Sequence, residues 1–443
     1  MPHRRAVFRC VAGCPGEFPL DEPIYVCPRC GELLEVHHDR EALQALSGAG
    51  WRSLLDERRG RVASGVWAQK EWVHPHLPDD ALVSLGEGRT PLLPAPRLGE
   101  SLGLRDLRVK QCGTSHTGSF KDLGMTVLVS AVHAMRRAGR PIRAVACAST
   151  GDTSAALAAF AATAGIPSVV ILPRAKVTTA QLLQPLASGS LVLSLDTDFD
   201  GCMAVVRELA KDPTVYLANS MNSLRLEGQK TIAAELVQQL GWQVPDWVIV
   251  PGGNLGNVSA IGAGFLLLRE LGVIDRLPRL ACAQAAAAAP LHRAYRSGFE
   301  LLPKVKAGDT QATAIRIGAP VSIRRAVRTL KALPGSMVTA ATEDELADAT
   351  ARADRAGLFA CPQTGVALAG LAQLVANGTV RPDERAVVIS TAHGLKFAEF
   401  KAGYHEARLP GVTARLANRP VELPASLDAV HETLDRLPPP RGR

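Results

Sequence analysis

The chain has 443 residues and a formal net charge of +8; 47% of its residues are hydrophobic and 21% are charged. This length fits two or three domains, and the composition is that of an ordinary globular protein. Aromatic residues make up only 4%, which argues against a nucleic-acid surface built on base stacking. No apolar run is long enough to cross a bilayer, and Met1–Arg5 leads to Cys10 and not to a signal-peptide core, so we expect a cytoplasmic protein.

Four of the nine cysteines gather in the first thirty residues: Cys10, Cys14, Cys27 and Cys30. Two close pairs separated by twelve residues are typical of a zinc ribbon, in which four thiolates surround one ion. The first pair is one residue wider than the commonest spacing, and the alternative is four surface thiols in a loose arm. We predict a structural zinc in a small module over residues 1–50. The odd total argues against a disulfide framework.

A short helix is expected over Asp39–Leu46, followed by an arm that carries Trp51, Trp67 and Trp72. From Leu107 onward, strands and helices alternate. The strands are expected over residues 143–148, 168–172, 191–195, 247–250, 279–283 and 385–390, and the helices over 153–164, 179–187 and 201–211.

Near-continuous hydrophobic strands separated by amphipathic helices indicate parallel sheets covered on both faces. We therefore predict an α/β fold with two doubly wound parallel-sheet lobes. The predicted units after the N-terminal module are 51–120 (arm and part of the large lobe), 121–240 (small lobe), 241–420 (large lobe) and 421–443 (tail). Residues 285–340 carry no readable pattern.

Lys121 stands within His116–Gly124, between small residues and the aromatic ring of Phe120. A lysine on an exposed helix face gains nothing from such neighbours. A lysine that holds a carbonyl compound covalently needs a tight, partly desolvated pocket that lowers the pKa of its amine. The alternative is an ordinary helix N-terminus capped by Ser119.

Three predicted strand ends carry unusual residues, at 148–154, 250–258 and 390–396. The first loop has small hydroxyl residues that suit a carboxylate or phosphate, although simple capping by Asp152 or Thr153 would also explain them. The second is rich in Gly and Asn, so that its backbone N–H groups form a nest for phosphate oxygens. In the third, Thr391 offers a neutral hydroxyl, whereas His393 is assigned no chemistry.

A reactive lysine, a phosphate nest and a hydroxyl-bearing strand end together fit pyridoxal phosphate best. The same segments resemble the fold type II pyridoxal phosphate enzymes, and among those the threonine synthases. Residues 219–231 and 361–367 resemble further motifs of that family, and the sequences of residues 115–118 and 149–152 resemble its plant-type branch. The match runs from about residue 33 to residue 405.

The resemblance implies that Lys121 binds the cofactor covalently and moves the Cα and Cβ protons, while Thr391 bonds the pyridine nitrogen. A neutral partner there leaves a weaker electron sink and favours elimination. It implies that the cofactor phosphate is held by Gly253, Asn254, Leu255, Gly256 and Asn257. Asp152 stands where much of the family has an asparagine near the phenolic oxygen of the cofactor. A carboxylate at that place requires a shared proton or an intervening water.

The substrate implied is O-phosphohomoserine, from which loss of phosphate at Cγ and addition of water at Cβ yield L-threonine. The residues implied in binding it are Ser149, Thr150 and Thr153 for its carboxylate or phosphate, and Asn219, Ser220 and Arg225 for its phosphate. An arginine offers the bidentate fork that phosphate oxygens prefer.

The family also implies a homodimer. Residues 64–73 resemble the arm through which S-adenosylmethionine activates plant-type enzymes, and an arm that merely packs on its neighbour is the alternative. Two other functions stay open at this point. One is cysteate synthase, which joins phosphoserine and sulfite on the same scaffold. The other is a nucleic-acid-binding protein on a degenerate enzyme scaffold, which the intact lysine and loops disfavour.

Overall fold

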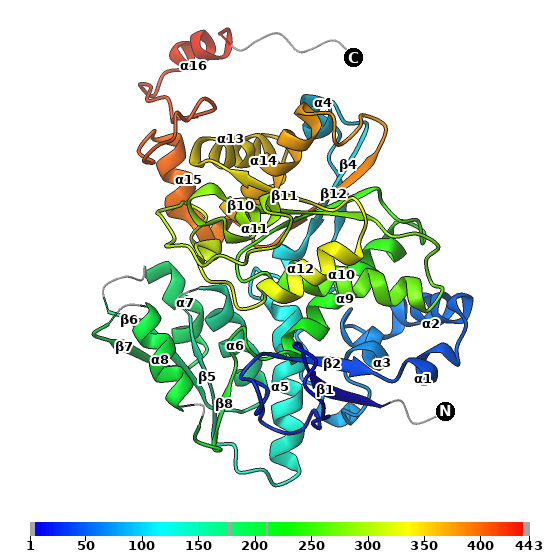
Figure 1. Ribbon diagram of the computed structural model, residues 1–443. Helices are drawn as coiled ribbons and strands as arrows, with labels where there is room; N and C mark the ends of the chain where they lie inside the picture. The colour runs from blue at the N-terminus through cyan, green and yellow to red at the C-terminus, as the bar shows by residue number, and fades with distance from the viewer. Residues whose placement is uncertain (1–4, 150, 175–178, 198, 210, 437–443) are drawn as a thin grey trace.

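The computed structural model describes residues 5–436 except 150, 175–178, 198 and 210. In this part of the chain the strands form one sheet of six, one of four and one of two. Figure 1 shows the six-stranded sheet in the upper half of the molecule, the four-stranded sheet at the lower left, and the two-stranded sheet in front of the long helix α5 (Lys121–Arg137). The predicted domain boundaries stay a prediction.

The large lobe is built on the six-stranded sheet, ordered β11-β10-β9-β12-β4-β3. Its strands are β3 (Leu92–Pro94), β4 (Asp106–Gln111), β9 (Trp247–Pro251), β10 (Arg279–Ala285), β11 (Met337–Ala341) and β12 (Arg385–Ser390). All neighbouring pairs are parallel except the edge pair β3 and β4. Helices α13 (Glu343–Arg355) and α14 (Pro362–Ala376) lie above this sheet, and α10 (Gly256–Glu270) and α12 (Ile323–Ala332) lie below it (Figure 1). Every residue of β9 is buried because both faces are covered.

The small lobe is built on a fully parallel sheet ordered β7-β6-β5-β8. Its strands are β5 (Ala144–Ala148), β6 (Ser168–Pro173), β7 (Leu191–Leu195) and β8 (Val215–Leu217), and its helices are α6 (Asp152–Thr163), α7 (Thr179–Ala187) and α8 (Phe199–Leu209). Helix α5 packs on α6 and on α9 (Leu224–Gln239), and α9 packs in turn on α10 of the large lobe. Helices α5 and α9 therefore join the two lobes.

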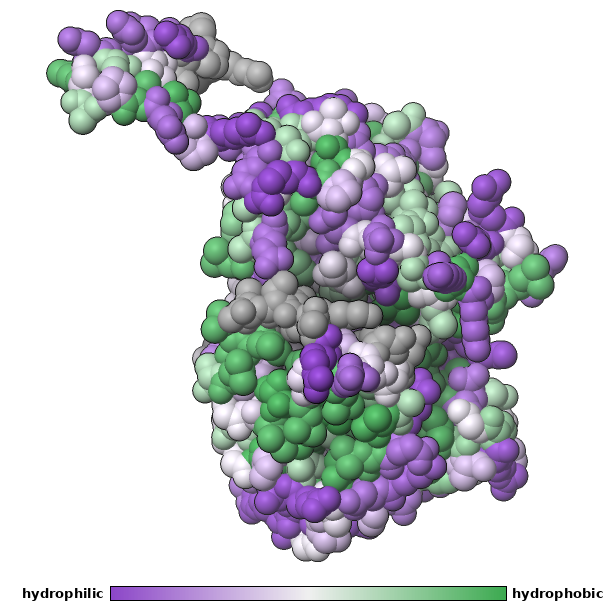
Figure 2. Space-filling model, turned by 90° about the vertical axis from the view of Figure 1, so that its left-hand side faces the viewer, coloured by the Kyte–Doolittle hydropathy of each residue, from purple (hydrophilic) through white to green (hydrophobic). Residues whose placement is uncertain are grey.

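The prediction of two doubly wound parallel-sheet lobes is confirmed. The strand predicted at 191–195 is not buried, because β7 is an edge strand whose residues are exposed or half-buried. Strand β11 lies in the stretch that carried no readable pattern, and its side chains are mostly small. Figure 2 shows a hydrophobic area over the small lobe, where Leu183, Leu186 and Leu191 are each more than half exposed.

The N-terminal module pairs β1 (Ala6–Cys10) with β2 (Leu34–His38) in antiparallel register. The predicted helix after it is present as α1 (Arg40–Gln44), capped by the side chain of Asp39. At the other end of the chain, α16 (Leu427–Leu434) has no buried residue and stands away from the body in Figure 1.

Candidate functional site

Lys121 is the first residue of α5, and its amine lies 3.9 Å from the centre of the Phe120 ring. Burial and the positive charge of Arg225 lower the pKa of this amine to about 7, against an opposing effect of Asp152. The N-cap residue Phe120 makes no side-chain capping bond, and the hydroxyl of Ser119 accepts from the N–H of Lys121 at 3.4 Å, so Ser119 takes part in this helix start beside the buried amine. An amine that titrates near neutrality can act both as nucleophile and as proton carrier.

The Gly/Asn loop between β9 and α10 forms a cradle. Leu255 adopts a left-handed conformation with φ +65°, and a Cβ on Gly253 would lie 2.9 Å from Cγ2 of Ile315. Asn257 is buried, and neither atom of its side-chain amide has a hydrogen-bond partner. A buried polar pair without a partner is costly, so this helix start is built to receive a polar ligand.

Asn254 ties this loop to two other segments. Its amide nitrogen donates to Ser220 Oγ at 3.2 Å, and its carbonyl oxygen accepts from the N–H of Ser322 at 3.2 Å. The loop and the first residues of the 219–231 segment are therefore in direct contact.

Thr391 follows β12 and is 5% exposed. Its N–H donates to Thr364 Oγ1 at 3.2 Å, and its hydroxyl lies 3.7 Å from the sulfur of Cys361. Its carbonyl oxygen accepts from the N–H of Phe120 at 2.9 Å, which places this strand end beside Lys121.

Asp152 is the first residue of α6, and no side chain caps that helix, so capping by Asp152 or Thr153 does not explain the loop. Its carboxylate lies 3.4 Å from the amine of Lys396, a residue to which the sequence assigned no role. Asp152 also raises the pKa of Lys121, in opposition to burial and Arg225.

Arg225 is 3% exposed, and its guanidinium donates to the carbonyl oxygen of Ala218 at 3.1 Å and to Thr153 Oγ1 at 3.3 Å. Its Nε has no partner. Burial lowers the pKa of Arg225 to about 10, so the group stays charged at neutral pH. A buried cation with a free donor is suited to an anionic ligand.

The side chain of Asn219 is already engaged. Its amide accepts from the N–H of Ala148 at 3.0 Å and donates to the carbonyl oxygen of the same residue at 2.9 Å. Asn219 thereby fixes the end of β5, from which Ser149 continues with its hydroxyl accepting from the N–H of Gly151 at 3.3 Å. Thr150 lies outside the described residues.

Residues 83–392 match the family model described as "Pyridoxal-phosphate dependent enzyme". The chain is 54% identical over 423 residues to threonine synthase 2, chloroplastic, of Arabidopsis thaliana, covering 94% of this chain and 82% of that protein. It is 38% identical over 430 residues to the threonine synthase of Methanocaldococcus jannaschii, covering 97% and 99% of the two chains. This chain belongs to the threonine synthase family.

The fold of this chain is also that of solved structures. The crystal structure of threonine synthase from Escherichia coli superposes with a TM-score of 0.68 at 19% identity, covering 97% of this chain and 99% of that one. In the described part of the chain, no helix is both long and apolar enough to cross a membrane.

The residues of this site fit pyridoxal phosphate. The Lys121 amine is desolvated, the Gly/Asn loop leaves room that a Cβ at Gly253 would fill, and the amide of Asn257 is unsatisfied. Family membership and this geometry agree on a pyridoxal-phosphate-dependent lyase.

Sequence reasoning missed two residues at the site. Lys396 stands inside the 390–396 motif, where a lysine three residues after a histidine carries no pattern of its own. Gln363 stands inside the 361–367 motif, and both atoms of its buried amide lack a partner. Only their burial in the tertiary structure distinguishes them from ordinary polar residues.

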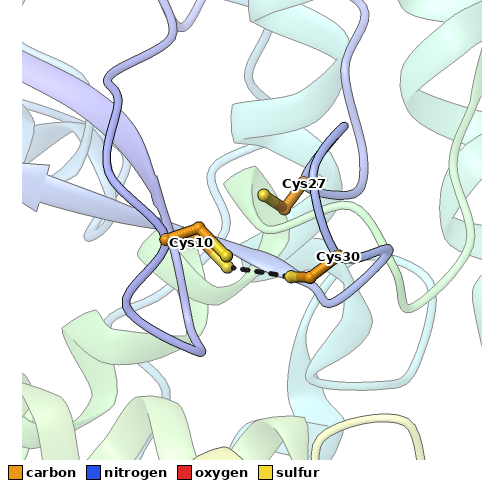
Figure 3. A group of neighbouring side chains, drawn as sticks. Cys10, Cys27 and Cys30 are labelled. Atoms are coloured by element: carbon orange, nitrogen blue, oxygen red, sulfur yellow. Dashed lines mark hydrogen bonds between the residues drawn. The ribbon is translucent and has the colours of Figure 1, made fainter.

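The four cysteines of the N-terminal module face one another across a short gap. Their sulfur atoms all lie within 4.8 Å of one another, and those of Cys10 and Cys30 are 3.5 Å apart. Figure 3 shows Cys10 at the end of β1 with its sulfur directed at those of Cys27 and Cys30 on the facing loop. Sulfurs around tetrahedral zinc are about 3.8 Å apart for a Zn–S bond of about 2.3 Å. None of the nine cysteines forms a disulfide.

Tight turns shape both halves of this cluster. The N–H of Gly13 donates to the carbonyl oxygen of Cys10 at 3.0 Å, and that of Gly31 donates to Cys27 at 2.8 Å. Both glycines have positive φ, +83° and +72°, which a side chain would strain.

The module is docked on the segment that follows β8. The hydroxyl of Ser223 and the guanidinium of Arg325 both donate to the carbonyl oxygen of Leu34, and Arg325 also reaches Ser223 Oγ at 2.8 Å. His38 contacts the Glu227 carboxylate at 2.7 Å, in a buried cluster that includes Lys230. Strand β2 thereby braces the turn that leads to Arg225.

Proposed function

We propose that this threonine synthase converts O-phospho-L-homoserine and water to L-threonine and inorganic phosphate. The observation that carries the proposal is the placing of Arg225, a buried cation with a free donor, close enough to lower the pKa of the Lys121 amine. A substrate bound there brings its phosphate to the arginine and its amino-acid end to the lysine.

Lys121 is proposed as the residue that binds the cofactor and transfers protons at Cα and Cβ. Pyridoxal phosphate, when bound, withdraws electrons from the substrate and so acidifies those positions. With a pKa of about 7, the Lys121 amine is close to the protonation balance that a proton carrier needs at neutral pH.

The cofactor phosphate is proposed to rest on Gly253, Asn254, Leu255, Gly256 and Asn257. Support comes from the start of α10, which offers backbone N–H groups and the positive end of a helix, and from the unsatisfied amide of Asn257 in its first turn. Thr391 is proposed to meet the ring nitrogen with a neutral hydroxyl.

The substrate is proposed to contact Ser149, Thr150, Thr153, Ser220 and Arg225. For Asn219 the proposal changes: because its amide already holds Ala148, we assign it the fixing of the Ser149 turn rather than the grip on phosphate. Ser220 keeps its proposed role, because its oxygen accepts from the amide of Asn254 in the cofactor loop and its hydroxyl hydrogen can still donate to the phosphate.

The cysteine cluster is proposed to hold one structural zinc through Cys10, Cys14, Cys27 and Cys30. All four ligand positions belong to the protein, and a closed site of this kind leaves no place for a substrate. The ion would stabilise the module and, through Leu34, the turn at Ser223.

A homodimer is proposed from the family and from the exposed leucines of the small lobe in Figure 2, since large apolar areas are commonly covered in assemblies. An S-adenosylmethionine site on the 64–73 arm is proposed from resemblance, and Trp67, bonded to Thr126 of α5 at 2.8 Å, gives that arm a contact with the active-site helix. The cytoplasmic location remains a prediction, and the Arabidopsis relative is named as chloroplastic.

The test is incubation of the full-length, cofactor-loaded protein with O-phosphohomoserine, scoring L-threonine and inorganic phosphate together. Equal amounts of both are expected. A parallel reaction with phosphoserine and sulfite tests for cysteate, whose formation in place of threonine would overturn the proposal.

A further inference from the structure

Lys396 lies on the 3-10 turn η6 (Gly394–Phe397), five residues after Thr391. Its amine is 3.4 Å from the Asp152 carboxylate, and it donates to the carbonyl oxygen of Thr117 at 2.9 Å and to the side-chain oxygen of Gln184. Three oxygen acceptors therefore surround this one amine, which has three N–H donors to offer. Both side chains are largely buried, with 18% of Lys396 and 10% of Asp152 exposed, so water screens their charges little.

The loop before Lys121 is shaped to admit the Lys396 stem. Gly118 has φ +81°, and a Cβ at that position would lie 3.0 Å from Cδ of Lys396. Gln184 also donates to the carbonyl oxygen of Thr117 at 3.0 Å, which closes a ring of bonds among α7, this loop and η6. The lysine is therefore held in place from three elements.

Two aspartates face this amine from different helices. Asp152 comes from α6, and Asp122 comes from α5, where burial raises its pKa while Thr117, Ser115 and Lys396 act to lower it. Along the chain, His393 and Glu399 are the nearest titratable residues, each three positions from Lys396. Asp152 and Arg225 act in opposite directions on the pKa of the Lys121 amine, which Asp152 raises and Arg225 lowers.

Asp152 therefore interacts with two lysines of different function. One makes a direct ion pair with it, and the other is the residue that must bind the cofactor. Without a partner, the Asp152 carboxylate would favour a proton on the Lys121 nitrogen and would repel any anionic oxygen brought near it.

We propose that Lys396 is a positioning residue that holds Asp152 in an ion pair and so offsets the negative charge that Asp152 places beside the Lys121 nitrogen. The pair then acts toward the cofactor as a neutral group, as an asparagine would. This rests on the proposed function, since it concerns the nitrogen through which the cofactor is held.

The experiment compares the cofactor-loaded, full-length wild type with Lys396→Met, Asp152→Asn and the double variant. Absorbance is followed from neutral to alkaline pH, which reports the protonation of the Lys121 nitrogen, and the dissociation constant of pyridoxal phosphate is measured separately. Lys211→Met is the matched control, because Lys211 is 72% exposed and is paired with Glu208 on the surface. Lys396→Arg keeps the charge.

Lys396→Met is expected to raise the pKa of the Lys121 nitrogen by about one unit, and Asp152→Asn to lower it by a similar amount. The double variant is expected to return close to the wild-type value, because a neutral pair has been replaced by two neutral side chains. If the ion pair only supported the structure, both single variants would bind the cofactor more weakly without opposite pKa shifts. The double variant would then bind the cofactor more weakly than either single variant.

Two results would overturn this inference while leaving the proposed function intact. One is an unchanged pKa of the Lys121 nitrogen in Lys396→Met, and the other is a double variant whose pKa does not return to the wild-type value. If the wild type took up no pyridoxal phosphate, the proposed function and this inference would fall together. If Lys396→Met does not fold, the inference is tested with two other proteins: Asp152→Asn alone, and Asp152→Asn combined with Lys396→Arg. Both Asp152→Asn proteins are expected to show the lowered pKa, and a pKa that does not fall would overturn the inference.

Discussion

The N–H of Phe120 donates to the carbonyl oxygen of Thr391 at 2.9 Å, and this bond helps to join two segments that are about 270 residues apart in sequence. It sets Lys121, the next residue after Phe120, beside the end of the central strand β12. The reactive amine and the hydroxyl proposed to meet the cofactor ring are thus parts of one rigid structure.

Replacing Lys121 by Ala is expected to abolish both the cofactor absorbance at the edge of the visible range and threonine formation. The reason is that no other described residue at the start of α5 offers an amine. Absorbance of the purified protein and product assay measure the two effects. Lys211→Ala, at an exposed pair with Glu208, serves as control and is expected to behave as wild type. Retained turnover in Lys121→Ala would refute the central assignment.

Arg225→Ala is expected to raise the KM for O-phosphohomoserine by about 10- to 100-fold, the equivalent of about 1.5–3 kcal/mol for charge-assisted bonds. Because Arg225 lowers the pKa of Lys121, the same variant is expected to shift that pKa upward. Steady-state kinetics and a pH profile check the two effects, with Arg143→Ala at an exposed ion pair as control. An unchanged KM would contradict the phosphate role.

Gly253→Ala is expected to weaken pyridoxal phosphate binding about tenfold, since the added Cβ would lie 2.9 Å from Ile315 and must displace the loop. Titration of the cofactor-free protein with pyridoxal phosphate measures the change. Gly60→Ala is the control: nothing lies within 4 Å of its Cβ on helix α2 (Gly48–Arg61). That variant is expected to be as stable as wild type or slightly more so.

Cys30→Ser is expected to remove bound zinc and lower the melting temperature by about 2 °C, for about 2 kcal/mol of lost stability. The KM for O-phosphohomoserine is expected to rise as well, because Leu34 of β2 braces Ser223 in the turn before Arg225. Metal analysis, thermal unfolding and kinetics are the measurements. Arg29→Ser, an exposed neighbour in the same turn without a thiol, is expected to change none of them. Wild-type protein purified without chelator and lacking zinc would argue against the site.

His38 is expected to make the protein sensitive to mild acid. Burial and the charge of Lys230 lower its pKa from 6.5 to about 4, although Glu227 opposes them. The neutral ring is therefore the folded form, and its contribution to stability is complete above pH 6.5 and is lost as the pH falls through 6.5 toward 4. The loss is about 2 kcal/mol at about pH 5.

Urea unfolding at about pH 7 and about pH 5 measures this effect in wild type and in His38→Gln, whose amide can still donate to Glu227. The variant is expected to lose less stability between the two pH values. Equal pH dependence in wild type and variant would show that folding does not lower the pKa of His38.

The sequence alone determined the alternation of strands and helices, the lysine, the Gly/Asn loop and the cysteine spacing. These features are local: period, turn residues and ligand spacing are properties of neighbouring residues, which is why β5, β6, β9, β10 and β12 were predictable within a few residues. Strand β11 was not, because its small side chains carry no pattern until they pack against β10.

Only the tertiary structure decided which charges meet. Asp152 and Lys396 are 244 residues apart, and nothing in either segment shows that they form a pair. The engagement of Asn219 by Ala148 and the free Nε of Arg225 likewise depend on how β5, β8 and α9 come together. Hydrogen-bond partners and burial are properties of the packed chain, and burial is what makes the charge at each of these positions matter.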